Sequence, residues 1–139
     1  MRCLLPGVAV GELLVLSAPL SFWGGVDPVT GTIVDGNHPE CGVKITGLIL
    51  AMPHGRGSSS SATVLAEMIR IGTAPCGLIL REPDQILVTA GFVANTLYGS
   101  KFVVSCGEAP EAADGMFRLD HAGLSRDKDE IGPVFDGDG

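Results

Sequence analysis

Residues 44–70 read KITGLILAMPHGRGSSSSATVLAEMIR, and this stretch decides the fold. Lys44–Met52 is dominated by aliphatic residues and predicts a strand. Pro53–Gly57 then interrupts the pattern with one proline and two glycines. Ser58–Ser61 supplies helix-capping side chains, and Ala62–Arg70 repeats apolar residues at three- and four-residue spacing, as a helix with one buried face does. A strand, a glycine turn and a helix in this order indicate an α/β domain.

Apolar segments on both sides of this unit predict the other elements. We expect further strands at residues 7–16, 76–80, 86–89, 101–105 and 116–119, and a short helix at residues 90–97. Gly72 is expected to end the central helix. Ser17–Asn37 contains too much glycine and proline for a helix but too many apolar residues for a solvated loop, so it is a candidate functional loop. Together these elements predict a mixed α/β domain with several strands and two or three short helices.

The composition describes one folded domain with an acidic end. The chain has 139 residues, of which 45% are hydrophobic and 18% charged, far from the composition of a disordered chain. Its net charge is −7, and residues 108–139 hold nine acidic residues against three basic ones, so most of the negative charge belongs to this segment. We expect residues 108–139 to be peripheral or partly mobile. The chain has no basic patch that could neutralise several phosphates, which disfavours a nucleic-acid partner.

Cysteine spacing and the amino-terminal segment both favour a cytoplasmic protein. The cysteines are Cys3, Cys41, Cys76 and Cys106, with no Cys-x-x-Cys pair among them. We therefore expect reduced, mostly buried thiols and no metal or cluster bound by this chain alone. The apolar run at residues 3–20 is interrupted by proline, glycine and glutamate, so it is expected to be a buried strand and neither a signal peptide nor a membrane span.

Gly55–Ser61 carries the residue types of an anion-binding loop. Glycines on either side of Arg56 let the backbone turn sharply and approach a ligand closely. The serines fall at the amino end of the predicted helix, where free N–H groups and the helix dipole attract negative charge. With the Arg56 guanidinium they form a candidate cradle for a carboxylate or phosphate, although the Gly-Lys-Ser/Thr ending of a nucleotide-binding loop is absent. The plainer alternative is a glycine turn before a capped helix, which requires no ligand.

Two motifs together resemble a known family. Gly55–Ser60, with the sequence Gly-Arg-Gly-Ser-Ser-Ser, looks like the catalytic loop in the swivelling domain of aconitase-type hydro-lyases. Pro19–Pro28, with the sequence PLSFWGGVDP, resembles the signature of the small subunit of aconitase X. It is followed, as in that family, by Thr30-Gly31, Asp35 and His38-Pro39. The resemblance covers roughly residues 7–105.

The resemblance implies a swivelling β/β/α domain over residues 1–107, with a mixed or barrel-like sheet. Such a domain closes over an active site on a separate large subunit, which would also carry the iron–sulfur cluster. Ser58, the first serine after Arg-Gly, would be the catalytic base. The substrate carboxylate would be held by Arg56, Gly57 and Ser59. The family loop has an arginine after its serines where this chain has Ser60, so anchoring by that arginine is not carried over.

The activity that the resemblance implies is the removal of water from a small hydroxy acid. Members of the aconitase X group dehydrate cis-3-hydroxy-L-proline or mevalonate 5-phosphate. Because Arg56 is the one basic residue in the presumed site, we favour a hydroxyproline-like substrate and keep the phosphorylated one as the alternative. The expected partner is the large subunit, in a heterodimer or a higher complex without nucleic acid or membrane. A non-catalytic anion- or partner-binding module and a purely structural subunit are the alternatives of other classes.

Three other side chains in or beside the motifs are candidates for a direct role. His38 and His54 are each interpreted mainly as solvated or hydrogen-bonded turn residues, with a direct role as the lesser alternative. Trp23 is expected to pack the long loop or to contribute to a subunit interface, rather than to form a platform for substrate.

Overall fold

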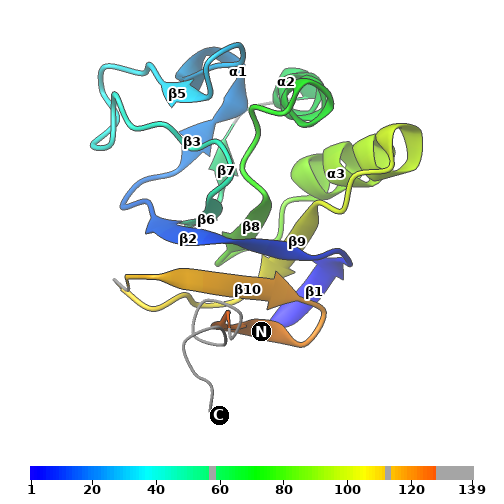
Figure 1. Cartoon of the computed structure of the whole chain (residues 1–139). Helices are drawn as coiled ribbons and strands as arrows, with labels where there is room; N and C mark the ends of the chain where they lie inside the picture. The colour runs from blue at the N-terminus through cyan, green and yellow to red at the C-terminus, as the bar shows by residue number, and fades with distance from the viewer. Residues whose placement is uncertain (57–58, 112–113, 128–139) are drawn as a thin grey trace, which may run out of the picture.

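The computed structural model describes residues 1–56, 59–111 and 114–127, and of Arg56 only the backbone. Within these residues, seven strands form one mixed sheet. They are β1 (Arg2–Leu5), β2 (Ala9–Val15), β6 (Ile49–Met52), β8 (Gly77–Leu80), β9 (Val103–Cys106), β10 (Met116–Asp120) and β11 (Gly123–Arg126). Across the sheet they lie in the order β1-β9-β8-β6-β2-β10-β11 (Figure 1). The central strands β9, β8, β6 and β2 run parallel, and β1, β10 and β11 pair antiparallel at the two edges.

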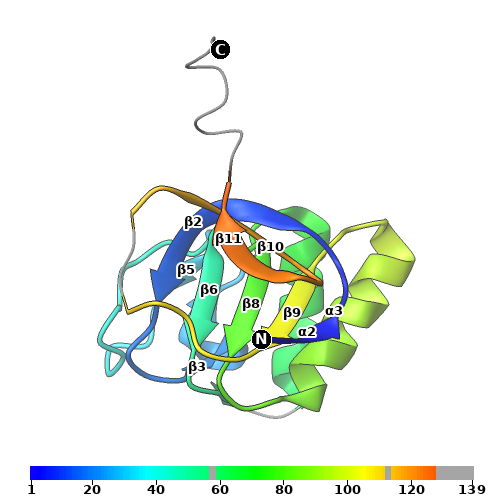
Figure 2. The same cartoon turned by 90° about the horizontal axis from the view of Figure 1, so that it is seen from below.

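Two long helices cover one face of this sheet. α2 (Ser59–Ile71) and α3 (Gln85–Tyr98) pack against each other on that face (Figure 1). The core between sheet and helices includes Leu50, Met52, Leu78, Leu80, Val104, Leu65, Met68, Leu87 and Ala90. A second core cluster includes Ile49, Ala51, Ile79 and Val103 from the central strands and Phe117 and Leu119 from β10. The sheet therefore curls into a half-barrel, with β10 and β11 over the face opposite the helices (Figure 2), and its central strands are buried on both faces.

The segment between β2 and α2 adds two short ladders and one helical turn at the end of the main sheet. These elements are β3 (Leu20–Ser21), α1 (Phe22–Gly25), β4 (Val26–Asp27), β5 (Thr32–Ile33) and β7 (Gly55–Arg56). β3 pairs in parallel with β7, and β4 pairs antiparallel with β5. Inside α1, Trp23 has an extended backbone and Gly24 a φ of +82°, a conformation that favours glycine. The candidate functional loop is therefore an ordered segment with its own secondary structure.

α2 confirms the predicted central helix and extends it at both ends. Gly72 ends this helix with a φ of +87°, as expected. The predicted strand at residues 86–89 is wrong, because these residues belong to α3. The Asp84 side chain caps this helix by accepting the backbone N–H groups of Ile86 and Leu87 at 2.9 and 3.3 Å. A short apolar run fits a strand or a buried helix equally well, and here the cap decides in favour of the helix.

The other predicted strands differ from the observed ones mainly at their amino ends. The strand expected at residues 7–16 is β2, which begins at Ala9, and β1 precedes it as a separate strand. Of the strand expected at residues 44–52 only Ile49–Met52 forms, since Gly47 turns the chain with a φ of +75°. β8 and β9 confirm the strands predicted before and after α3.

Two strands lie beyond the domain boundary expected after residue 107. β10 confirms the strand predicted at residues 116–119, and it pairs with β2 from Met116↔Glu12 to Leu119↔Ala9. β11, which was not expected, pairs with β10 at the edge of the sheet. Residues 128–139 lie outside the described residues, so the expected mobility of the acidic end stays a prediction.

α3 presents an uncharged and partly apolar face to solvent. Its sequence, QILVTAGFVANTLY, contains no charged residue. The exposed apolar side chains of α3 are Phe92, Val93, Leu97 and Tyr98. A groove of about 490 Å³ runs between α2 and α3 and is lined by small and apolar residues such as Ala62, Ala66 and Val93. α3 has 14 residues, and in the described part of the chain no helix combines the length and apolar character that a membrane crossing requires.

Candidate functional site

The parallel pairing of β3 with β7 brings the two sequence motifs side by side. In this ladder Leu20 pairs with Gly55, and Ser21 pairs with Arg56. The Pro19–Pro28 motif therefore lies next to the segment that leads into α2, although β6 separates the two motifs in the sequence. α1 also packs against α2 (Figure 1). The candidate site is the region where these elements meet, at the amino end of α2.

The structure describes both ends of the serine loop. Arg56 ends β7, and Ser59 opens α2 with its side chain exposed. Gly57 and Ser58 lie outside the described residues, so their roles and that of the Arg56 side chain stay predictions. The helix dipole gives the start of the 13-residue α2 a partial positive charge. An anion bound between β7 and α2 would therefore lie in a favourable field.

Ser61 joins the first turn of α2 to α1. The residue is 1% exposed, and its Oγ accepts the backbone N–H of Trp23 at 3.4 Å. Ser21 Oγ lies 3.3 Å from Ser61 Oγ and donates to the Trp23 carbonyl oxygen at 2.9 Å. Side-chain hydrogen bonds thus connect the two motifs in addition to the β3–β7 ladder. In the sequence the four serines resemble a single run of capping residues, and no local signal indicates that the last of them is buried.

The two adjacent aromatic residues of α1 have opposite environments. Phe22 is 0% exposed in the core between the sheet and the helices, whereas Trp23 is 64% exposed. The expectation that Trp23 packs the long loop is therefore wrong, and Phe22 has this role. A contribution of Trp23 to a subunit interface stays a prediction.

β7 has no room for a side chain at Gly55. A Cβ there would lie 2.3 Å from Asp84 Oδ2 and 2.9 Å from Leu87 Cδ1. The other carboxylate oxygen of Asp84, Oδ1, caps α3. The capping carboxylate of α3 therefore packs directly on the strand that leads into α2, and Asp84 and Leu87 would have to shift to admit a side chain at position 55.

Gly55→Ala is expected to lower the free energy of unfolding by about 1–3 kcal/mol, because Asp84 and Leu87 must move to admit the methyl group. Thermal unfolding of the full chain, followed by circular dichroism, measures the change. Gly36→Ala is the matched control, since a Cβ at Gly36 would meet nothing within 4 Å. Equal melting temperatures for the two variants would contradict the close packing at β7.

The two histidines near the motifs make local hydrogen bonds. His38 is 7% exposed, and its Nδ1 accepts the backbone N–H of Glu40 at 3.0 Å. Its Nε2 lies 3.2 Å from the Ala18 carbonyl oxygen, which fits a neutral ring that carries its proton on Nε2 and donates to Ala18. The exposed His54 has Nδ1 at 2.8 Å from the Gly55 carbonyl oxygen. These contacts support the interpretation of both histidines as hydrogen-bonded turn residues.

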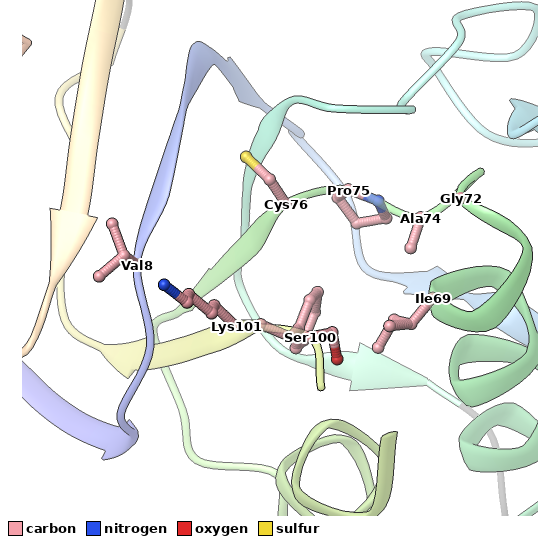
Figure 3. A pocket seen from close by; sticks show the side chains of 9 residues that line it. Val8, Ile69, Gly72, Ala74, Pro75, Cys76, Ser100 and Lys101 are labelled. Carbon is pink, nitrogen blue, oxygen red and sulfur yellow. The ribbon is translucent and has the colours of Figure 1, made fainter. Parts of the chain in front are cut away.

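A pocket at the carboxyl end of α2 is remote from this site. It has a volume of about 210 Å³, and Ile69, Gly72, Cys76 and Lys101 are among its lining residues (Figure 3). Burial raises the pKa of the Cys76 thiol to about 11, so this thiol is protonated at neutral pH and is a poor nucleophile. Across the described residues, no group of three or more His, Cys, Asp or Glu side chains could hold a metal ion.

Comparison with known proteins connects the fold and the site to one family. Residues 1–113 match the aconitase X swivel domain. The chain is 46% identical over 105 residues to the cis-3-hydroxy-L-proline dehydratase of Pseudomonas aeruginosa, and the alignment covers 76% of this chain and 18% of that protein. It is 54% identical over 77 residues to the phosphomevalonate dehydratase small subunit of Methanopyrus kandleri, and this alignment covers 55% of the chain and 57% of the relative. The chain thus spans less than two thirds of the length of either relative.

Solved structures share the same architecture. The holo-form of aconitase X from Thermococcus kodakaraensis superimposes with a TM-score of 0.75 at 30% identity, covering 88% of this chain and 90% of that one. The solution NMR structure of a UPF0107 protein gives a TM-score of 0.73 at 25% identity, covering 90% of this chain and 95% of that one. The similarity to the aconitase X structure confirms the predicted swivelling-domain architecture.

Proposed function

The chain belongs to the aconitase X swivel-domain family, and from this premise we propose that it is the small subunit of a hydro-lyase that removes water from a small hydroxy acid. The observation that carries the proposal is the β3–β7 ladder, which sets the Ser-Phe-Trp-Gly-Gly motif beside Arg56 at the amino end of α2. Binding loops are commonly held by a rigid scaffold. The central parallel strands, which are buried on both faces of the sheet, provide such a scaffold here.

In this proposal Ser58 is the catalytic base, which takes a carbon-bound proton from the substrate. A serine hydroxyl is a weak base unless its alkoxide is stabilised. Ser58 immediately precedes α2, so N–H groups at the helix start can stabilise the alkoxide, and the Arg56 guanidinium adds a positive charge. The substrate carboxylate is bound by Arg56, Gly57 and Ser59. The exposed position of Ser59 at the start of α2 supports this assignment.

The described residues do not fit the ligand set of an iron–sulfur cluster. Among the cysteines, Cys41 is exposed, and Cys3, Cys76 and Cys106 are partly buried. Such a cluster is held by several thiolates, and in the described part of the chain no three metal-binding side chains gather at one place. We therefore assign the cluster to the large subunit, where it would act as a Lewis acid on the leaving hydroxyl. This chain then contributes the proton acceptor and the anion-binding groups.

A large subunit is the partner that completes the proposed active site, in a heterodimer or a higher complex. Relatives named small subunits imply a partner of this kind. The surface supports the proposal, because Phe92, Leu97 and Tyr98 are exposed on the uncharged α3. Trp23 is also exposed, and its backbone is bonded to the first turn of α2. Exposed apolar surface of this kind is typical of proteins that bind a partner.

Cis-3-hydroxy-L-proline, or a close analogue, is the substrate that we favour. The segment from Gly55 to Ser61 contains one basic residue, Arg56, which suits a single carboxylate better than a carboxylate together with a phosphate. Mevalonate 5-phosphate is the second candidate, and the 54% identity to a phosphomevalonate dehydratase small subunit favours it.

Assay of both compounds with the chain and its co-expressed large subunit tests this proposal. Dehydration of cis-3-hydroxy-L-proline by the pair, and by neither subunit alone, is the expected result. Turnover of mevalonate 5-phosphate instead would establish the second candidate. If an assembled and cluster-loaded pair acted on neither compound, the hydro-lyase proposal for these substrates would fail and a non-catalytic anion- or partner-binding module would be favoured.

A further inference from the structure

The run of four serines divides into exposed and buried members. Ser59 and Ser60 are exposed at the start of α2, whereas Ser61 is 1% exposed. The base and the carboxylate-binding groups proposed above do not include Ser61. A buried hydroxyl is normally hydrogen-bonded, and two contacts of this one lead to the other sequence motif.

The Ser61 hydroxyl lies between α2 and the peptide groups of Trp23. The Trp23 N–H donates to Ser61 Oγ at 3.4 Å, and the Trp23 carbonyl oxygen accepts from Ser21 Oγ at 2.9 Å. The two hydroxyl oxygens, Ser21 Oγ and Ser61 Oγ, also lie 3.3 Å apart, and either can be the donor in this contact. The hydroxyls of Ser61 and Ser21 therefore bind the N–H and the carbonyl oxygen of Trp23.

These bonds act on a segment that side-chain packing does not hold. Trp23 and Gly24 depart from helical geometry within α1, and the Trp23 side chain is 64% exposed. Phe22, by contrast, is fully buried and fixes the start of the turn. Gly25 fixes its other end, because it is buried and its carbonyl oxygen accepts the N–H groups of Val34 and Asp35 at 2.9 and 3.3 Å. Between these two points, the hydrogen bonds of the Trp23 peptide groups contribute to its position relative to α2.

We propose that Ser61 is a positioning residue, which holds Trp23 at the amino end of α2 and so keeps the two motifs aligned. The inference rests on the proposed function, because that function places the substrate at this end of the helix. Phe22 is buried independently of the Ser61 hydroxyl, so we expect loss of this hydroxyl to loosen Trp23 and Gly24 without unfolding the domain. Alignment of the two motifs is needed most in the transition state. Loss of the Ser61 hydroxyl is therefore expected to lower kcat more than it raises KM.

The single tryptophan of the chain provides a direct readout of this role. In the full chain, Ser61→Ala is expected to increase the amplitude of fast local motion in the fluorescence anisotropy decay of Trp23. Thr63→Ala is the matched control, because Thr63 is an exposed hydroxyl residue of the same helix, and its Oγ1 donates within the helix, to the Ser59 carbonyl oxygen at 3.4 Å, rather than across to α1. Ser21→Ala removes the other hydroxyl at a less buried position, so it tests the same arrangement if Ser61→Ala folds poorly.

In the assembled enzyme, Ser61→Ala is expected to lower kcat about tenfold, the factor that corresponds to one lost hydrogen bond. Ser21→Ala is expected to behave alike, and the double variant to lose little more than either single one, because both hydroxyls hold the same residue. Additive losses, or an anisotropy decay that Ser61→Ala leaves unchanged, would overturn the positioning role and leave the hydro-lyase proposal intact. An altered anisotropy decay of the chain, together with an assembled pair that dehydrates neither compound, would support the positioning role and count against the proposed function alone.

Discussion

Ser58→Ala is expected to lower kcat of the assembled enzyme by about a hundredfold to ten-thousandfold, the range that general-base catalysis contributes. The alanine cannot accept the carbon-bound proton, whereas Arg56, Gly57 and Ser59, which we propose bind the carboxylate, remain. KM is therefore expected to change little. Steady-state kinetics of the dehydration reaction measure both parameters.

Thr63→Ala is the control for this experiment, since it removes an exposed hydroxyl from α2 beyond the proposed binding groups. Co-purification of the two subunits shows whether each variant still assembles. If Ser58→Ala retains activity within a few-fold of the unmodified enzyme, Ser58 is not the base. A purely structural subunit predicts a different outcome, in which changes at Arg56 and Ser58 affect assembly and nothing else.

The central unit of the fold could be predicted because several local signals agree there. At residues 44–70 the aliphatic run, the glycine turn, the serine caps and the helical spacing all point to the same elements. Residues 86–89 show the limit of such reasoning, because an apolar run of that length has no decisive periodicity. The available signal was Asp84, a residue type that favours helix N-caps and that stands directly before the apolar segment.

The contact between the two motifs could not be predicted from local sequence. β3 and β7 have two residues each, too few to show the alternation that identifies a strand, and β6 lies between them in the chain. The family resemblance connected the motifs to one function without indicating that they touch. The burial of Ser61 depends on the same contact, since the Trp23 N–H that it accepts comes from the other motif.

Phe22→Ala is expected to lower the free energy of unfolding of the full chain by about 3–5 kcal/mol. Phe22 is 0% exposed and shares its core cluster with Leu20 of β3 and Leu65 of α2, so alanine would leave a cavity between the long loop and the helix. Domains of this size are stable by about 5–15 kcal/mol, so the loss would be a large part of the total. Urea unfolding followed by circular dichroism measures the change.

Trp23→Ala is the matched comparison, because it truncates the neighbouring aromatic residue of the same turn. Trp23 is 64% exposed, so its removal is expected to change the free energy of unfolding by less than about 0.5 kcal/mol. Circular dichroism is the suitable probe, since this variant lacks the only tryptophan of the chain. A loss of stability in Trp23→Ala as large as that in Phe22→Ala would show that the indole holds the loop, which is one of the two roles that the sequence suggests. A difference of several kcal/mol would instead separate the two residues, with Phe22 needed for folding and Trp23 available at the surface for a partner or substrate.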